Sequence, residues 1–521
     1  MIVAISRAKR FSPNSEDKDA RILKSLCDLL KQSGFDIKVM DEDNFNLQPD
    51  ADLYISMARS EATLKILNDS PVPVINKPES VLLNCQNRKR LFNIISVSGF
   101  YVPFASGYQS LDDVSAKDGY WVKKNYGYSE CEQDVVYARN VEERDAAVAA
   151  MKARGIEDVY VCPHIKGDLV KFYGVCNTPF FRFYYPDDDG EMKFSNNGHN
   201  GLPKHTPFDA YEFWCESTAV ANTLGLDFYG GDCIVKENGD RVYIDINDWP
   251  SYSRCYKEAA EYMAILAVYA MHHGDLEVLR NRIKSGYYEA VIFDYGGTLD
   301  SDGMHWGKRI WHAYQKCGVP VDEALFREAY VHAERTLATN PIILKDDDFT
   351  TTLRKKLFIE MDYISEHIEN FNPYEWICDV LYTLIDDTKK STDTTDEVMR
   401  YVFGNYVNND KTILVSNFYG NINAVLRQFG LEGYFSHVIE SAVVGVRKPD
   451  PEIWRMGLRA LGVTDASKVL VIGDSYDKDI IPAHEIGCDT LWFMGEGWTP
   501  VIPDGKQADW VMTTWFDIYE P

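Results

Sequence analysis

The residues best suited to chemistry in this chain follow a short apolar run in its second half. Residues 290–293 read AVIF, which is typical of a buried strand, and the segment DYGGTLD follows directly at residues 294–300. Asp294 is therefore expected at the carboxyl end of a strand, next to a glycine turn. A carboxylate in that setting can act as a nucleophile beside a bound Mg²⁺.

Three further signals follow apolar runs in the same half, in a fixed order. Ser416 ends the run TILVS, Lys448 precedes a proline, and Asp474 follows VLVIG, with Asp479 five residues further on. A single feature of this kind is common in turns and helix-entry loops. Four of them at the ends of predicted strands favour one shared site.

Together these residue types suit phosphoryl transfer. Asp294 could attack phosphorus and form an aspartyl phosphate, while Ser416 and Lys448 hold its oxygens. Asp474, together with Asp294 and the turn carbonyl of Gly296, could bind Mg²⁺ through hard oxygen ligands.

The first half carries a second set of oxygen ligands on a predicted hairpin. Asp232 lies on one strand, and Asp245 and Asn247 lie on the other, around the turn sequence ENGD at residues 237–240. Side chains alternate along a strand, so Asp245 and Asn247 share a face, and Asp232 can face the same space. Two carboxylates and an amide suit a Mg²⁺ that bridges nucleotide phosphates. The alternative is a solvated hairpin face.

Lysines and a glycine-containing loop accompany this hairpin. Lys123 or Lys124 ends a predicted strand before the loop NYGYS, which could cover phosphates, and Lys171 lies on a further strand. Residues 157–164 are typical of a strand that passes into a hinge, whose backbone would meet an adenine.

Basic residues elsewhere in this half predict an anionic acceptor. Arg7, Lys9 and Arg10 follow the first strand, at the end where open sheets bind ligands. Arg182, His199 and Arg254 could join them. Each residue alone is as compatible with a surface charge, but together they concentrate positive charge in an acidic chain.

Composition excludes several classes of partner. The chain has 521 residues and a net charge of −26, which argues against general affinity for nucleic acid or anionic membranes. Its eleven cysteines include no C-x-x-C pair, which favours a reducing cytoplasm over a disulfide framework or a zinc site. The first residues are typical of a strand, not of a signal peptide. We therefore expect a cytoplasmic protein.

The pattern of elements predicts an α/β multidomain protein. Residues 1–100 alternate short strands with amphipathic helices, including one at 79–97, and predict a small open α/β domain. Residues 101–285 carry longer, hairpin-prone strands and end in a helical stretch at 256–284.

The second half begins after a very short linker. Residues 288–521 show the strand–helix alternation of a parallel sheet, interrupted at about 301–411 by a helical pattern. That stretch is too long for a plain loop, so we expect a helical cap.

The signals of the second half resemble those of the haloacid dehalogenase-like (HAD) superfamily. The resemblance implies a Rossmannoid parallel sheet with a helical cap and a phosphohydrolase reaction. It makes Asp294 the nucleophile, Ser416 and Lys448 phosphate-binding groups, and Asp474 a metal ligand. Asp479 would be a second metal ligand or would support one.

Gly296 departs from this pattern. Members of the superfamily usually carry there an aspartate that protonates the leaving alkoxide, and a general acid typically contributes about 10²–10⁴-fold. Three explanations are open. The cap supplies an acid, with His305, His312 or Asp302 as candidates; the substrate has a good leaving group; or the domain binds without turnover.

The first half resembles the ATP-grasp fold, in which a pre-grasp α/β unit precedes two lobes that clamp ATP. The resemblance implies that Asp232, Asp245 and Asn247 bind Mg²⁺ and that Lys123 and Lys171 bind ATP phosphates. The segments KFYGV and IDINDWPSY are most similar to the inositol-phosphate 5/6-kinase branch, with the ribosomal-protein glutamate-ligase branch as nearest competitor. Two residues depart from the pattern of the fold. Asp245 replaces the usual glutamate of the metal-binding motif, and Ser251 stands where a glycine is common.

We therefore predict a bifunctional phosphoryl-transfer enzyme that uses ATP and Mg²⁺. A kinase half would act on a small polyol or phosphorylated metabolite, and a HAD-like half would act as a phosphatase. The alternative is a carboxylate–amine ligase, fused to a HAD domain that is a phosphatase or a non-catalytic binding module. The acceptor and the oligomeric state stay open.

Overall fold

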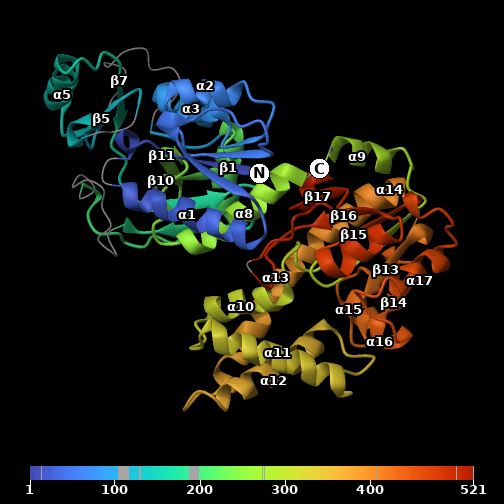
Figure 1. Cartoon of the computed structure of the whole chain (residues 1–521). Helices are drawn as coiled ribbons and strands as arrows, with labels where there is room; N and C mark the ends of the chain where they lie inside the picture. Colours follow the sequence, from blue (N-terminus) through green and yellow to red (C-terminus); the bar gives the residue numbers. More distant parts are fainter. Residues whose placement is uncertain are drawn as a thin grey trace. The chain divides into compact units, whose positions relative to one another are not determined.

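The computed structural model describes residues 1–12, 15–103, 116–127, 131–186, 199–272, 274, 276–407, 409–499 and 501–519. Its contacts form two compact units, Met1–Ala270 and Met271–Pro521, whose elements are labelled in Figure 1. Among the described residues, no helix combines the length and apolarity that crossing a membrane requires.

The first unit begins with a small parallel sheet. Its strands are β1 (Ile2–Ser6), β2 (Ile37–Asp41), β3 (Leu53–Ser56) and β4 (Val74–Ile75), paired in the order β2-β1-β3-β4. The central strands β1 and β3 are almost wholly buried, and the helices α1 (Glu16–Gln32) and α2 (Glu61–Asn68) connect strands of the sheet. This is the predicted open α/β arrangement.

The single helix predicted at 79–97 is wrong, because two helices lie there. α3 (Pro78–Gln86) ends before Asn87, and α4 (Arg88–Val97) begins after it. The Asn87 side chain accepts a hydrogen bond from the backbone N of Arg90 at 2.9 Å, so it caps α4. This break places Arg88 at the first position of a helix.

Two antiparallel sheets complete the first unit. β5 (Tyr120–Lys124), β6 (Val135–Ala138) and β7 (Val159–Pro163) pair in the order β6-β5-β7, and α5 (Val141–Ala153) packs on them. β8 (Asp168–Val175), β9 (Phe181–Tyr184), β10 (Phe228–Val235) and β11 (Arg241–Asp248) pair in the order β11-β10-β8-β9. α4 and α7 (Ala210–Leu224) share the core of this second sheet. The predicted hairpin between β10 and β11 is confirmed.

The helical stretch predicted at 256–284 is also two helices. α8 (Tyr256–His272) is almost entirely in the first unit, whereas α9 (Leu276–Lys284) belongs to the second. Arg282 of α9 donates to Asp489 at 2.8 Å, which fixes the helix to the second unit.

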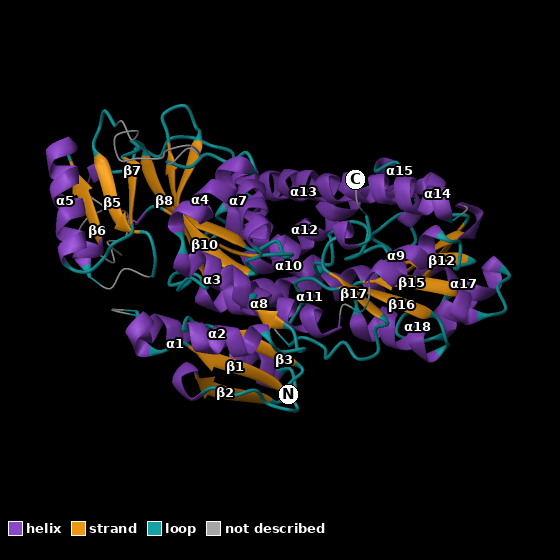
Figure 2. Ribbon diagram, turned by 90° about the horizontal axis from the view of Figure 1, so that it is seen from above, coloured by secondary structure: helices purple, strands orange, loops and turns teal. Residues whose placement is uncertain are grey.

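The second unit is built on a six-stranded parallel sheet. The order is β14-β13-β12-β15-β16-β17, with β12 (Ala290–Phe293), β13 (Thr412–Ser416), β14 (His437–Glu440), β15 (Val469–Gly473), β16 (Asp489–Phe493) and β17 (Trp510–Met512). Figure 2 shows β15 and β16 side by side within it. One face packs against α17 (Glu452–Leu461), whose Trp454 is buried among strand residues.

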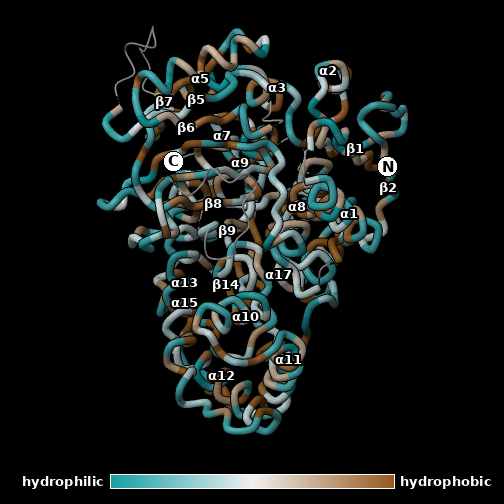
Figure 3. The backbone as a smooth tube through the Cα atoms, turned by 90° about the vertical axis from the view of Figure 1, so that its left-hand side faces the viewer, coloured by the Kyte–Doolittle hydropathy of each residue, from teal (hydrophilic) through white to brown (hydrophobic). Residues whose placement is uncertain are grey.

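A helical cap lies between β12 and β13, as predicted. Its main helices are α10 (Trp306–Cys317), α11 (Glu323–Thr339), α12 (Phe349–Ser365) and α13 (Ile377–Val398). Hydrophilic and hydrophobic residues alternate along these helices (Figure 3), as expected where one face is buried. The chain enters the cap at Gly303, whose backbone lies so close to Gly495 that a Cβ on Gly495 would sit 2.4 Å from it.

Candidate active sites

The nucleophile candidate of the second unit lies where three parallel strands end side by side. Asp294 follows β12, and its backbone N donates to the carbonyl of Ile472 in β15 at 2.9 Å. Ser416 is the last residue of β13, on the other side of β12, and Asp474 follows β15. Parallel sheets bind ligands at these carboxyl ends.

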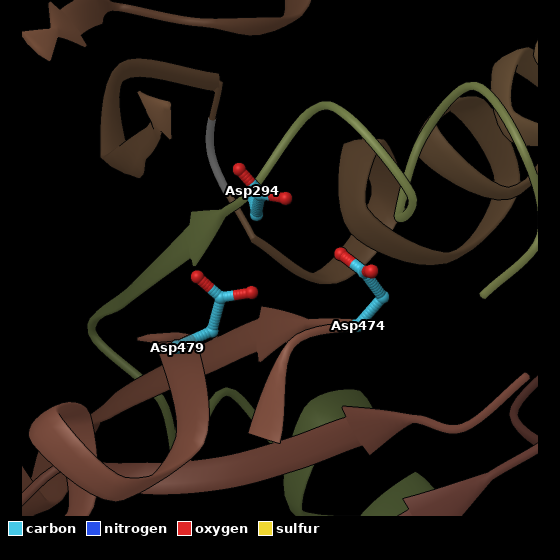
Figure 4. A group of neighbouring side chains, drawn as sticks. All are labelled: Asp294, Asp474 and Asp479. Atoms are coloured by element: carbon cyan, nitrogen blue, oxygen red, sulfur yellow. The ribbon is translucent and has the colours of Figure 1, made fainter. Parts of the chain in front are cut away.

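Three of the predicted acids converge at this edge. Carboxylate oxygens of Asp294, Asp474 and Asp479 all lie within 4.8 Å of one another, and Figure 4 shows the side chains around one space. Lys448 Nζ donates to Asp294 Oδ1 at 2.5 Å and to Asp479 Oδ1 at 2.7 Å. Lys448, Asp294 and Asp479 are buried, so this charge cluster is largely removed from solvent.

The electrostatics of the cluster show an excess of negative charge. Burial, followed by the charges of Asp294 and Asp479, raises the pKa of Asp474 well above its usual range. Burial likewise raises the pKa of Asp479 to about 6. For Lys448, burial acts to lower the pKa, but Asp294 and Asp479 outweigh it and raise the pKa. One lysine does not compensate three carboxylates.

A divalent cation fits this donor set. Mg²⁺ prefers carboxylate oxygens, and it would neutralise the charge that burial makes unfavourable. Asp294, Asp474 and Asp479 would hold it. The carbonyl of Gly296, on the same turn as Asp294, stays a predicted ligand.

Two glycines allow the carboxylates to approach so closely. Gly297 has φ +100°, and a Cβ there would lie 2.3 Å from Asp474 Cγ. At Gly473 a Cβ would lie 2.5 Å from Asp479 Cβ. Any side chain at either position would displace a member of the acid cluster.

Of the predicted phosphate-binding residues, Ser416 ends β13 and Lys448 lies on a neighbouring loop. Ser416 is buried at the end of β13. The next residue, Asn417, donates from Nδ2 to the Lys448 carbonyl at 3.1 Å and accepts from the Lys448 backbone N at 2.9 Å. Asn417 therefore holds the Lys448 loop against β13, a role that no sequence spacing indicated.

Asp300 and Trp306 are further site residues that the sequence did not single out. Trp306 Nε1 donates to Asp300 Oδ2 at 2.9 Å, and the backbone N of Gly297 donates to Asp300 Oδ1 at 2.8 Å. Asp300 is buried, and burial raises its pKa to about 7. The position of Asp300 at the end of the segment DYGGTLD could have pointed to it. Its contact with the Trp306 indole could not be predicted, because it depends on where the first helix of the cap begins.

The three cap residues considered as general acids, His305, His312 and Asp302, each form a hydrogen bond with another residue. His312 Nε2 and Glu496 Oε2 lie 2.6 Å apart, and Ser391 Oγ donates to Asp302 Oδ2 at 2.5 Å. His305 Nδ1 accepts from the backbone N of Gly307 at 3.0 Å. Burial lowers the pKa of His305 to about 4, so the imidazole is neutral at physiological pH.

A cavity of about 350 Å³ lies within the first unit. It brings together most of the residues predicted there, namely Lys123, Lys171, Asp232, Asp245, Asn247 and Arg7. Of the neighbouring pair, Lys123 lines the cavity. Lys124 is instead directed to Asp134, whose Oδ2 lies 3.8 Å from its Nζ.

Two carboxylates of this cavity, Asp232 and Asp245, each pair with a basic side chain. Lys171 Nζ donates to Asp232 Oδ1 at 2.7 Å, and Arg88 Nη1 donates to Asp245 Oδ1 at 2.7 Å. Asn247 Nδ2 donates to Asp245 Oδ2 at 3.1 Å. Burial alone would raise the pKa of Asp245, but Arg88 and then Lys123 lower it below its usual range.

Arg88 is the residue that sequence reasoning missed in this cavity. It starts α4, and its backbone N donates to the carbonyl of Asn125 at 2.8 Å, which ties it to the loop after β5. The described residues that line the cavity include five basic side chains and four carboxylates, namely Arg7, Arg59, Arg88, Lys123 and Lys171, and Asp19, Glu132, Asp232 and Asp245. These groups suit a polyphosphate together with a cation. In each ion pair, the basic side chain could bind a phosphate oxygen instead, and the carboxylate could bind a metal ion.

The expected hinge lines the same cavity. Cys162 and Pro163 of β7 contribute to its wall, followed by His164, whose Nδ1 accepts from Trp121 Nε1 at 3.1 Å. His199 also lines the cavity and contacts the Trp121 ring, with ring centroids 5.6 Å apart. Trp121, His164 and His199 give this wall aromatic surface against which a planar base could pack.

The predicted cluster of acceptor-binding arginines is not assembled among the described residues. Arg7 lines the cavity, where its Nη1 donates to Asp19 at 2.9 Å and its Nη2 to the Trp249 carbonyl at 3.1 Å. Arg182 instead pairs with Glu258, and Arg254 lies over the Tyr184 ring at 5.1 Å. Neither of these two arginines is among the described residues that line the cavity.

The two basic residues beside Arg7 point elsewhere. Lys9 is directed to Glu16 at 3.9 Å, and Arg10 to Asp43 at 2.5 Å; all four side chains are exposed. Charge alone does not place a side chain in a cavity, because a nearby carboxylate competes for it.

Comparisons with known proteins agree with this geometry. A family model for haloacid dehalogenase-like hydrolases matches residues 288–487. A glyceraldehyde 3-phosphate phosphatase from Pyrococcus abyssi is 41% identical over 63 residues, which are 12% of this chain and 26% of that protein. The pyrimidine 5'-nucleotidase YjjG of Escherichia coli is 30% identical over 107 residues, which are 20% of this chain and 47% of that protein. The chain thus spans less than half the length of each relative.

Among solved structures, a RimK domain ATP-grasp protein from Sphaerobacter thermophilus is similar to part of the chain. The TM-score is 0.37 and the identity 13%, over 51% of this chain and 100% of that one.

The fold and the site of the second unit agree with the family match. Residues 288–487, which match the haloacid dehalogenase-like hydrolase model, include four strands of the parallel sheet, the helical cap and the acid cluster. The first unit consists of a parallel α/β domain followed by two antiparallel sheets, and residues of both antiparallel sheets line one cavity.

Proposed function

We propose that this protein is a bifunctional phosphoryl-transfer enzyme. Its first unit transfers the γ-phosphoryl group of ATP to a small acceptor, and its second unit removes a phosphoryl group from a phosphorylated metabolite. The observation that carries the proposal is that each unit holds its own cluster of carboxylates and lysines at a place where its fold binds ligands.

In the first unit, catalysis would consist of positioning and charge stabilisation. Lys123, Lys171 and Arg88 would bind the ATP phosphates, and Asp232, Asp245 and Asn247 would hold Mg²⁺, which when bound neutralises phosphate charge. Arg7, which also lines the cavity, would contact the acceptor, and the hinge with Trp121 would receive the adenine. A hydroxyl acceptor gives a kinase, and a carboxylate acceptor gives the acyl phosphate of a ligase.

In the second unit, Asp294 would attack phosphorus and form an aspartyl phosphate, which water then hydrolyses. Lys448 and Ser416 would hold the phosphoryl oxygens as negative charge develops. Mg²⁺, held by Asp294, Asp474 and Asp479, would supply further positive charge. The names of the two relatives, a phosphatase and a nucleotidase, support a phosphohydrolase.

Product analysis tests the first unit. The protein is incubated with ATP, Mg²⁺ and a metabolite pool, and products are followed by mass spectrometry. A kinase adds one phosphoryl group to an acceptor, which is the expected result. Joining of two metabolites with release of free phosphate would instead establish a ligase. If the protein bound no ATP in the presence of Mg²⁺, the assignment of the first unit would fail.

The thiols support a reducing compartment for both activities. All eleven cysteines lie among the described residues, and no disulfide joins any of them. We place the protein in the cytoplasm, where ATP and phosphorylated metabolites are present.

A further inference from the structure

Gly296 is not a glycine that the backbone or the packing requires. It has no positive φ, and a Cβ there would lie 3.7 Å from Trp306 Cδ1 and 3.8 Å from Trp306 Nε1, which are ordinary contact distances. The neighbouring Gly297 has φ +100° and space for no side chain at all. Residue 296 is therefore free to carry a small side chain and carries none.

The indole of Trp306 covers the space beside Gly296. Trp306 is the first residue of the first cap helix, α10, and its Nε1 donates to Asp300 Oδ2 at 2.9 Å. Asp300 is fixed in turn, because its Oδ1 accepts from Gly297 N at 2.8 Å and Ser301 Oγ at 3.2 Å. Asp300 acts as a positioning residue that holds a flat, apolar surface next to the nucleophile turn.

The described N–H and O–H donors around Asp294 are already engaged by neighbouring carboxylates. Lys448 is held between Asp294 and Asp479, and the Thr298 hydroxyl donates to Asp474 at 3.2 Å. The indole N–H is used by Asp300, and it is far too weak an acid to release its proton. The three cap candidates, His305, His312 and Asp302, are engaged as described above.

We infer that the second unit cleaves phosphoryl groups from leaving groups that are stable as free anions, such as the carboxylate of an acyl phosphate, and discriminates against alkyl phosphate monoesters. This inference rests on the proposed phosphohydrolase function of that unit.

The chemistry balances without an acid at residue 296. Asp294 Oδ forms a bond to phosphorus while the bond from phosphorus to the leaving oxygen breaks, and the electron pair departs with a carboxylate or phosphate anion. Water then attacks the aspartyl phosphate, which releases inorganic phosphate, restores the Asp294 carboxylate and passes one proton to the solvent. An alkoxide would have to leave unprotonated, which costs about 10²–10⁴-fold in rate.

A leaving-group series tests the inference on the full-length protein. Acetyl phosphate, p-nitrophenyl phosphate and ethyl phosphate are compared by kcat/KM. We expect kcat/KM for ethyl phosphate to be at least about 10²-fold below that for acetyl phosphate. Similar values for the two would overturn the inference and leave the phosphohydrolase standing.

A matched pair of variants tests the role of residue 296. Gly296→Asp adds a carboxyl group, and Gly296→Ala fills the same space without one. We expect Gly296→Asp to raise the ethyl-to-acetyl phosphate ratio about 10-fold or more, and Gly296→Ala to leave it unchanged. Equal ratios in the two variants would overturn the inference.

Formation of the phosphoenzyme distinguishes an error in the inferred leaving-group preference from an error in the proposed phosphohydrolase function. Wild-type protein treated with acetyl phosphate should gain one phosphoryl group on Asp294, seen by mass spectrometry of the acid-quenched protein. Absence of both this adduct and any hydrolysis of acetyl phosphate would reject the proposed phosphohydrolase, and the inference with it.

Discussion

At the scale of single residues, Asp294 has the environment of a nucleophile. It is buried at a strand end and faces Lys448 and two further carboxylates. Asp294→Asn keeps the shape of the side chain but removes its nucleophilic charge. We expect phosphohydrolase turnover to fall at least about 10³-fold and the phosphoenzyme to be absent.

Asp393→Asn is the matched control for that substitution. Asp393 is exposed on α13 and pairs with Lys389, so the Asp393→Asn variant should turn over at the wild-type rate. A phosphoenzyme that still forms in Asp294→Asn would assign the nucleophile to another residue.

Two adjacent lysines give a test of the proposed ATP site in the first unit. Lys123 and Lys124 follow one another on β5, but Lys123 lines the cavity and Lys124 is directed to Asp134. We expect Lys123→Met to weaken ATP binding in the presence of Mg²⁺ about 10-fold, because a hydrogen bond to a charged group contributes about 1.5–3 kcal/mol. Lys124→Met should change it little. Isothermal titration calorimetry measures both, and equal losses would refute the placement of Lys123.

How well single residues could be predicted depended on where their partners lie. Asp294, Asp474 and Lys448 were predictable because strand-end motifs place them at one edge of a parallel sheet. Arg88 was not, because its partner Asp245 is 157 residues away and the two helices around Asn87 read as one. The position of Arg182 outside the cavity lining was not predictable either, because the sequence gives its charge but not its pairing with Glu258.

At the scale of elements, the cap carries a buried acid with a consequence for pH. Glu360 of α12 is fully buried, and its Oε1 has no hydrogen-bond partner among the described residues. Tyr314 Oη donates to its Oε2 at 3.3 Å. Burial, the largest influence, raises the pKa of Glu360 from 4.5 to about 7.

The sign of the pH effect follows from this raised pKa. Between about pH 4.5 and 7 the folded cap binds the proton of Glu360 more tightly than the unfolded chain does, so stability falls as the pH rises through this window. We expect the wild type to lose up to about 3 kcal/mol relative to Glu360→Gln between pH 5 and 8. Differential scanning calorimetry at each pH measures the difference in Tm. Glu366→Gln, an exposed position at the end of the same helix, should show no such difference.

Element boundaries were less predictable than element types. The parallel and antiparallel sheets, the hairpin before β11 and the helical cap follow from hydrophobic periodicity and turn signals. The stretch at 256–284 was read as one helix, because its apolar periodicity continues across a change of unit. Periodicity reports that a face is buried but not which core buries it.

At the scale of the whole molecule, the two candidate sites lie in different units. All the described residues that line the cavity belong to the first unit, and Asp294, Asp474 and Asp479 belong to the second. The two activities should therefore be separable. We expect Asp294→Asn to leave ATP affinity within about twofold of wild type, and Lys123→Met to leave acetyl phosphate hydrolysis within about twofold. A loss of both activities in either variant would contradict independent sites.

The contact between Gly303 and Gly495 has a consequence for how this molecule can change over evolution. Gly303 opens the cap and Gly495 follows β16. A Cβ on Gly495 would lie 2.4 Å from the Gly303 backbone, and Gly303, with φ +80°, would place a Cβ 3.1 Å from Gly495 N. A larger residue at one of these two positions cannot be accommodated by a larger residue at the other. Related chains should therefore keep small residues at both positions or change the two positions together. A cap transplanted from such a relative would have to bring its own counterpart of the segment at 493–496. The segment that must be exchanged to replace the cap is thus larger than the cap itself.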